Sequence, residues 1–194
     1  MEHPLILASQ SPRRREYLAL LQRPYTCVSP EVDETLAPGL SPHACVMQLA
    51  QRKARAVARG AQPHALCIGA DTVVVHAGKI LGKPRDEADA FAMLSKLQND
   101  IHQVYTGVCI CEAGTGRETC SYRATQVQFA PMTPQEIRAY IATGEPMDKA
   151  GAYGIQGLGA AYITGICGCY YNVVGLPIAL VRQMLLQWEE GAEL

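Results

Sequence analysis

The sequence predicts one domain of the α/β class, residues 1–194, with two lobes and helices flanking a long mixed β-sheet. Three observations predict this class. The apolar run Leu5–Ala8 leads directly into a helical pattern, as in a βα unit. Residues 66–75 form a near-continuous apolar run that is typical of a buried strand. Residues 102–112 and 117–129 alternate in polarity and are split by a Gly-Thr-Gly turn, which predicts a long antiparallel hairpin.

The first half of the chain alternates strands with helices. Ser11-Pro12 and Ser41-Pro42 are helix-start signals, because a serine oxygen accepts from the free N–H groups and proline fits the first helical position. Asp86 can cap a third helix. The expected elements are a strand at 4–8, helices at 13–22 and 41–59, strands at 66–75 and 80–81, and a helix at 86–98.

The second half of the chain changes to the predicted hairpin and short elements. Thr133 and Glu136 form a capping box for a helix that stops at Gly144. A glycine-rich segment follows, and Pro177 opens a last amphipathic helix. The glycine-rich segment covers 148–159 and precedes strands expected near 160–165 and 170–175.

The composition is that of an ordinary globular protein, with 48% apolar and 18% charged residues. The formal net charge is -1, so the chain offers no bulk attraction to nucleic acid or to a membrane surface. The first apolar run is too short for a signal peptide, and no run approaches the roughly 18 apolar residues of a membrane span. We therefore expect a cytoplasmic protein with no nucleic-acid or membrane partner.

The eight cysteines are scattered through apolar stretches without a CxxC pair. Two CxC pairs lie in strand-like segments, where both thiols of a pair face the same side of the sheet. This pattern favours buried reduced thiols over a zinc site. The five histidines show no metal-ligand spacing.

Asp71 is the first candidate for chemistry, because it interrupts an apolar strand just after Gly69 and Ala70. A carboxylate at the end of a buried strand is costly to desolvate unless a cation, a metal or hydrogen bonds hold it. Carboxylates at strand ends line clefts in α/β folds, which favours a functional role over a carboxylate that only caps the next turn.

The segment from Ser9 to Arg15 is a candidate anion site. A helix N-terminus carries partial positive charge, so arginines there are unfavourable unless an anion compensates them. The Ser9 hydroxyl and the free N–H groups supply neutral donors of the kind that bind phosphate. Because Arg13, Arg14 and Arg15 spread around the helix, at most two of them face one ligand. The alternative is a solvated helix face.

Lysines and acidic residues extend this pattern. Lys53 lies on the inner side of the 41–59 helix, while Lys83 and Lys149 lie beside short glycine-containing turns. Each alone is typical of a surface lysine, but together with the arginines they favour a polyphosphate ligand. The acidic cluster that ends at Glu34 is usually a solvated loop. If it faces Asp71, these carboxylates would hold Mg²⁺ together with phosphate oxygens.

Seven segments together resemble the Maf-like nucleoside triphosphate pyrophosphatases, in the family's order and over nearly the whole chain. They are "LILASQSPRRREYL", "LAQRKARAV", "IGADTVVV", "LGKPRD", "HQVYTGV", "GEPMDKAGAYGIQG" and "YNVVGLP".

The resemblance implies a fold related to that of inosine triphosphate pyrophosphatase, with an active-site cleft between two lobes, in a homodimer. It implies hydrolysis of a nucleoside triphosphate to the monophosphate and pyrophosphate with a divalent metal cation, Mg²⁺ or Mn²⁺. Asp71 is the implied proton acceptor, and Glu34 matches a family position in the site. We expect Glu34 and Asp71 to be the metal ligands. The implied substrate contacts are Ser9, Arg13, Lys53, Thr72, Lys83 and Gln156, and we expect Arg14, next to Arg13 at the helix start, to be a further contact.

The run "DKAGAYGIQG" resembles the dTTP/UTP branch of this family, since the 7-methyl-GTP branch replaces the glutamine by an acid. The amide of Gln156 both donates and accepts, which suits the O4 and N3–H edge of uracil or thymine. Modified pyrimidine nucleotides fit the same edge. Two alternatives stay open, a 7-methyl-GTP pyrophosphatase and a non-catalytic nucleotide-binding regulator of cell division. A pure binder gains nothing from a carboxylate such as Asp71 near a triphosphate.

Overall fold

The fold is described by a computed structural model for residues 3–190, which divide into two compact units. The first unit comprises residues 3–71, 106–123 and 175–190. The second unit comprises residues 72–105 and 124–174. Three long strands contribute residues to both units.

A seven-stranded mixed sheet confirms the predicted α/β class. Its order is β2-β1-β3-β5-β6-β7, with β4 paired to β3. Strand β1 runs parallel to β2 and β3, whereas β4 is antiparallel to β3 and β7 is antiparallel to β6. The strands are β1 (Leu5–Ala8), β2 (Tyr25–Val28), β3 (Leu66–His76), β4 (Lys79–Leu81), β5 (Ile101–Glu112), β6 (Glu118–Phe129) and β7 (Ile163–Cys167).

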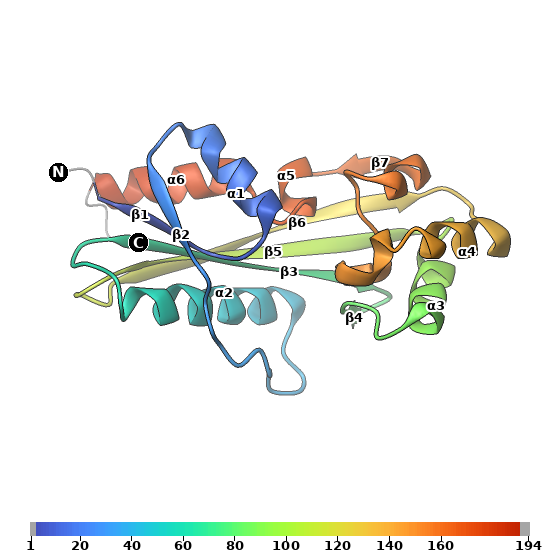
Figure 1. Cartoon of the computed structure of the whole chain (residues 1–194), viewed down its shortest axis with the longest axis horizontal. Coiled ribbons are helices and arrows are strands. Elements are labelled where there is room, and N and C mark those ends of the chain that lie inside the picture. The colour runs from blue at the N-terminus through green and yellow to red at the C-terminus, as the bar shows by residue number, and fades with distance from the viewer. Residues whose placement is uncertain (1–2, 191–194) are drawn as a thin grey trace. The chain divides into compact units, whose positions relative to one another are not determined.

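Three helices belong to the first unit: α1 (Pro12–Leu18), α2 (Pro42–Ala58) and α6 (Ile178–Glu189). Helix α2 covers one face of the sheet, and α1 and α6 cover the other (Figure 1). Ser11 caps α1 by accepting a hydrogen bond from the Arg14 N–H at 3.4 Å, and Pro12 is the first helical residue, as the sequence predicts. Within residues 3–190, no helix has both the length and the apolar character of a membrane span.

The second unit contains α3 (Glu87–Leu97), α4 (Pro134–Ala142) and α5 (Tyr170–Val173). The predicted caps are present: Asp86 accepts from the Asp89 N–H at 2.7 Å, and Thr133 and Glu136 form the capping box of α4. Helices α3 and α4 lie side by side (Figure 1) and share one apolar core with the ends of β5 and β6.

Two predicted elements and one predicted cap differ from the structure. Ser41 precedes α2 but makes no capping hydrogen bond through its side chain, and its Oγ lies 3.1 Å from His43 Nε2. The strand expected near 170–175 is wrong, because residues 170–173 form helix α5. Asn172 is buried there, and its Nδ2 donates to the Val104 carbonyl at 2.8 Å and to the Thr125 hydroxyl at 3.0 Å, so both amide N–H groups are paired in this arrangement. Strand β2 is not predicted by the sequence analysis, because its four residues gain their order from parallel pairing with β1.

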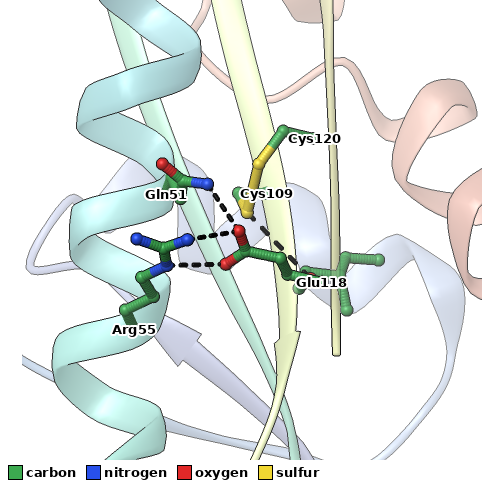
Figure 2. Close-up of a disulfide and its surroundings, with 6 residues drawn as sticks. Gln51, Arg55, Cys109, Glu118 and Cys120 are labelled. Carbon is green, nitrogen blue, oxygen red and sulfur yellow. Dashed lines mark hydrogen bonds and ion pairs between the residues drawn. A yellow bond between two sulfur atoms is a disulfide. The ribbon is translucent and has the colours of Figure 1, made fainter. Parts of the chain in front are cut away.

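Cys109 of β5 and Cys120 of β6 form a disulfide in the first unit, which corrects the expectation of reduced thiols for these two residues (Figure 2). Because β5 and β6 are joined by a tight turn, residues equally distant from that turn lie opposite each other. Cys109 and Cys111 share one core cluster with Ala50 and Ala54 of α2, as the CxC spacing predicts.

His102 is buried in the core of the second unit. Its Nε2 lies 2.7 Å from the Tyr153 hydroxyl, and its ring packs against Phe129 with the ring centroids 5.5 Å apart. Its Nδ1 has no hydrogen-bond partner among the described residues. Burial lowers the pKa of His102 to about 4, and the nearby His76 adds to the shift. The imidazole is therefore neutral at neutral pH.

We expect His102 to make the fold sensitive to acid. Below pH 6.5, the pKa of histidine in the unfolded chain, His102 is protonated in the unfolded state but stays neutral in the folded state. The free energy of unfolding therefore decreases as the pH falls from 6.5 toward 4. Between pH 7.5 and 5 this loss amounts to about 2 kcal/mol. Urea unfolding at both pH values measures the loss. The free energy of unfolding of His102→Gln, whose side chain does not titrate, should fall by about 2 kcal/mol less than that of the wild type. Equal losses would contradict the assignment.

Candidate functional site

The Lys53 ammonium joins two of the predicted carboxylates in the first unit. Its Nζ lies 2.6 Å from Asp71 Oδ1 and 2.8 Å from Glu34 Oε1. The side chains of Lys53 and Asp71 are 10% and 13% exposed, whereas that of Glu34 is 60% exposed. A nearly buried charge is stable only when it is paired, and removing one partner leaves the other uncompensated. The three residues therefore form one charge cluster that opens to solvent at Glu34.

A glycine in β3 brings α2 close enough for this contact. A Cβ atom on Gly69 would lie 2.1 Å from the Ala50 carbonyl oxygen and 2.7 Å from the Ala54 nitrogen, so only glycine fits. Gly69 and Asp71 are two residues apart on one strand and share a face. The same close approach that seats α2 on β3 therefore places Lys53 against Asp71.

Arg52 fixes the loop that carries Glu34, a role that the sequence analysis missed. Its Nη1 donates to the Asp33 carbonyl at 2.8 Å and to the Thr35 carbonyl at 2.7 Å. The Thr35 N–H in turn donates to the Asp33 carboxylate at 2.8 Å. The only sequence signal was the position of Arg52 beside Lys53. Of the predicted acidic cluster, Glu34 is the member that these contacts bring to Lys53.

A second network holds α2 against β6 on either side of Lys53. Arg55 donates to Glu118 through Nε at 2.7 Å and Nη2 at 2.5 Å, and Gln51 donates to the same carboxylate at 2.5 Å (Figure 2). Hydrogen bonds from Arg55 lower the pKa of Glu118, so the carboxylate stays charged at neutral pH. These contacts restrain the turn of α2 that bears Lys53.

The predicted arginines lie beside this cluster. The Arg14 guanidinium donates through Nε to the Gly175 carbonyl at 2.8 Å, which pins α1 to the segment before α6. Burial lowers the pKa of Arg14, while the charges of Asp71 and Glu34 oppose that shift. Arg14 is thus within electrostatic range of both carboxylates. Arg13 is half-buried and interacts electrostatically with Arg14.

Ser9 is buried, and its Oγ accepts a hydrogen bond from the Ser11 N–H at 3.1 Å. Its hydroxyl hydrogen is a donor at the carboxyl end of β1. Arg15 is exposed, as expected for a solvated side chain.

The remaining predicted residues belong to the second unit. Thr72 directly follows Asp71 in β3, and Lys83 is exposed in the loop after β4. Gln156 is exposed in the segment between Tyr153 and Leu158. The Gly151 N–H donates to the Gly82 carbonyl at 3.0 Å, so the loop of Lys83 contacts the segment that leads to Gln156.

The donor set at Lys53 suits a hard cation. No group of three or more His, Cys, Asp or Glu side chains in residues 3–190 forms a complete metal cage. Mg²⁺, however, is usually held by one or two carboxylates together with substrate phosphates and water. Glu34 and Asp71 already converge on one positive charge, the Lys53 ammonium, so these two carboxylates fit a divalent cation.

A separate groove of about 810 Å³ runs along β1, β2 and the end of α2. Its lining is mostly apolar, and Glu31 is its one charged side chain. None of the residues that line this groove is a lysine or an arginine, so it has no cationic side chain to bind a polyphosphate. We therefore place the candidate site at Lys53 and Asp71.

Comparisons with known proteins identify one family over nearly the whole chain. The family described as "Maf-like protein" matches residues 4–188. A protein of Moorella thermoacetica named "dTTP/UTP pyrophosphatase" is 52% identical over 181 residues, which cover 93% of each chain. A protein of Syntrophomonas wolfei with the same name is 50% identical and covers 92% of this chain and 94% of its own.

Among solved structures, a HAM1 protein from Coxiella burnetii is similar in fold, with a TM-score of 0.55 and 14% sequence identity. The match covers 96% of this chain and all of the other. At this level of identity the likeness concerns the fold alone.

We expect the substitution Gly69→Ala to destabilise the first unit by about 1–3 kcal/mol, because the new Cβ overlaps the Ala50 carbonyl and pushes α2 from β3. Gly60→Ala is the matched control, since a Cβ there meets nothing within 4 Å. Urea unfolding of the two variants measures the difference. Equal stability would show that α2 does not need the close approach.

Proposed function

Because the chain belongs to the Maf-like protein family, we propose that it hydrolyses dTTP and UTP to the nucleoside monophosphate and pyrophosphate. Relatives that are about half identical over more than nine tenths of both chains carry the name dTTP/UTP pyrophosphatase. The observation that carries the proposal is the cluster of Lys53, Asp71 and Glu34, which combines a carboxylate base with a cation for phosphate.

A divalent cation completes the proposed site. Glu34 and Asp71 would hold Mg²⁺ or Mn²⁺, since both are oxygen ligands that already face one cation. When bound, the cation would neutralise charge on the phosphate oxygens.

Asp71 has the central role in the reaction. We assign it to orient the attacking water and to accept its proton as the water oxygen bonds to the α-phosphorus. The bond from the α-phosphorus to the bridging oxygen breaks, and pyrophosphate leaves. Lys53 binds Asp71 Oδ1, which fixes the carboxylate and leaves Oδ2 for the water.

The cations of the first unit are assigned to the phosphates. Arg13, Arg14 and Lys53 would bind the β- and γ-phosphates and hold the leaving group in line, with Ser9 as a neutral donor. The Arg14 guanidinium carries five N–H donors, and the one on Nε binds the Gly175 carbonyl.

Other parts of the proposal rest on the sequence resemblance. Lys83 is assigned to the phosphates, and Thr72 and Gln156 are assigned to the pyrimidine base. A cytoplasmic homodimer is proposed on the same ground. A solution mass of twice 21.0 kDa supports the dimer, and a mass of 21.0 kDa counts against it.

We expect pyrophosphate, not phosphate, to be released from UTP and dTTP in a panel of nucleoside triphosphates with Mg²⁺ that includes 7-methyl-GTP.

Asp71→Asn should lower kcat by about 100-fold or more, because a positioned general base contributes about 10²–10⁴-fold. Asp100→Asn is the matched control, since Asp100 is exposed and pairs with His76. Phosphate release, a preference for 7-methyl-GTP, or full activity in Asp71→Asn would each contradict the proposal.

A further inference from the structure

In the second unit, the segment that carries Gln156 is hydrogen-bonded on both sides to the side chains of Glu145 and Tyr140. Glu145 accepts hydrogen bonds from the Leu158 N–H at 2.8 Å and from the Gly159 N–H at 3.1 Å, on the far side of Gln156. On the near side, the Gly154 N–H donates to the Tyr140 hydroxyl at 3.1 Å. The Tyr140 hydroxyl in turn donates to Glu145 at 2.8 Å, so the hydrogen bonds from both sides of Gln156 are linked through the Glu145 carboxylate.

Glycines permit this wrapping. A Cβ on Gly157 would lie 2.2 Å from Glu145 Oε2, and one on Gly159 would lie 2.5 Å from the Tyr140 hydroxyl oxygen. Neither residue has a positive φ, so close approach rather than backbone conformation requires glycine at both positions. The glycine-rich sequence here surrounds a carboxylate of the protein itself.

Glu145 and Tyr140 are themselves held in place. Tyr140 is 3% exposed on α4, whose first turn has the capping box. Lys149 donates to the Glu145 carbonyl at 2.8 Å. Partial burial favours the neutral form of Glu145, but the N–H groups of Gly159 and Leu158 and the Tyr140 hydroxyl outweigh it and lower its pKa. Burial raises the pKa of Tyr140, so at neutral pH a phenol donates to a carboxylate.

We propose that Glu145 and Tyr140 are positioning residues that fix the Gln156 segment and thereby set the selectivity for uracil over cytosine. This inference rests on the proposed function, in which Gln156 reads the base. A glutamine amide can turn over and exchange its oxygen and nitrogen, so it suits either base edge unless its place is fixed. Selectivity then requires one fixed distance and direction from the Gln156 amide to the base, and the main chain that sets both is held at Gly154, Leu158 and Gly159.

The test measures kcat/KM for UTP and for CTP in Glu145→Gln. The amide offers one acceptor oxygen where the carboxylate receives three donors, so the segment shifts. We expect the UTP/CTP ratio to fall about tenfold, the effect of losing about one well-placed hydrogen bond between Gln156 and the base. Glu87→Gln is the matched control, since Glu87 is exposed in the first turn of α3. A ratio within twofold of the wild type in Glu145→Gln overturns the proposal.

A double-mutant cycle separates positioning from general stability. If Glu145 acts through Gln156, Glu145→Gln should change the ratio by less than twofold when Gln156→Ala is already present. Additive changes overturn the proposal.

Tyr140→Phe removes one hydroxyl and keeps the buried ring, and it serves if Glu145→Gln does not fold. It should lower the ratio in the same direction, and an unchanged ratio in a folded Tyr140→Phe overturns the proposal. Failure of the proposed function looks different, because the wild type would then release no pyrophosphate from UTP.

Discussion

The ion pair between the Lys53 ammonium and the Asp71 carboxylate is the interaction on which the rest of the first unit depends. Two charges that are almost shielded from water are costly unless their geometry is kept, and removal of one partner costs about 3–5 kcal/mol. Gly69 allows α2 to approach β3, and Glu118 holds α2 against β6. Arg52 brings the loop of Glu34 to the same ammonium. These contacts share one result: a carboxylate and a cation are kept together midway along β3, and not at a strand end as the sequence predicts.

In both units, glycine allows a close contact that a Cβ atom would prevent. Gly69 lets a helix backbone approach a strand, and Gly157 and Gly159 let a loop close around Glu145. A glycine-rich segment in a chain of this family suggests a phosphate-binding loop, but here the close contacts of Gly157 and Gly159 are with Glu145 and Tyr140.

The fold was largely predictable because its signals are local. Helix caps at Ser11, Asp86 and Thr133 and the alternation of the hairpin depend on neighbours in the chain, and all are confirmed. The site was predictable only in part. Residue type and strand context mark Asp71 as a candidate, but its contact with Lys53 depends on packing between α2 and β3. The one-turn helix α5 likewise depends on partners distant in sequence, since Asn172 binds Val104 and Thr125. The Cys109–Cys120 pairing, in contrast, follows from the register of the predicted hairpin, in which the two residues lie equally far from the turn.

The central claim is that Asp71 directs water to the α-phosphorus of a pyrimidine nucleoside triphosphate. Hydrolysis of UTP in water enriched in oxygen-18 tests it most directly, because the atom that water attacks keeps the labelled oxygen. Mass spectrometry of both products should find the label in UMP and none in pyrophosphate. Label in pyrophosphate would place the attack on the β-phosphorus and contradict the account.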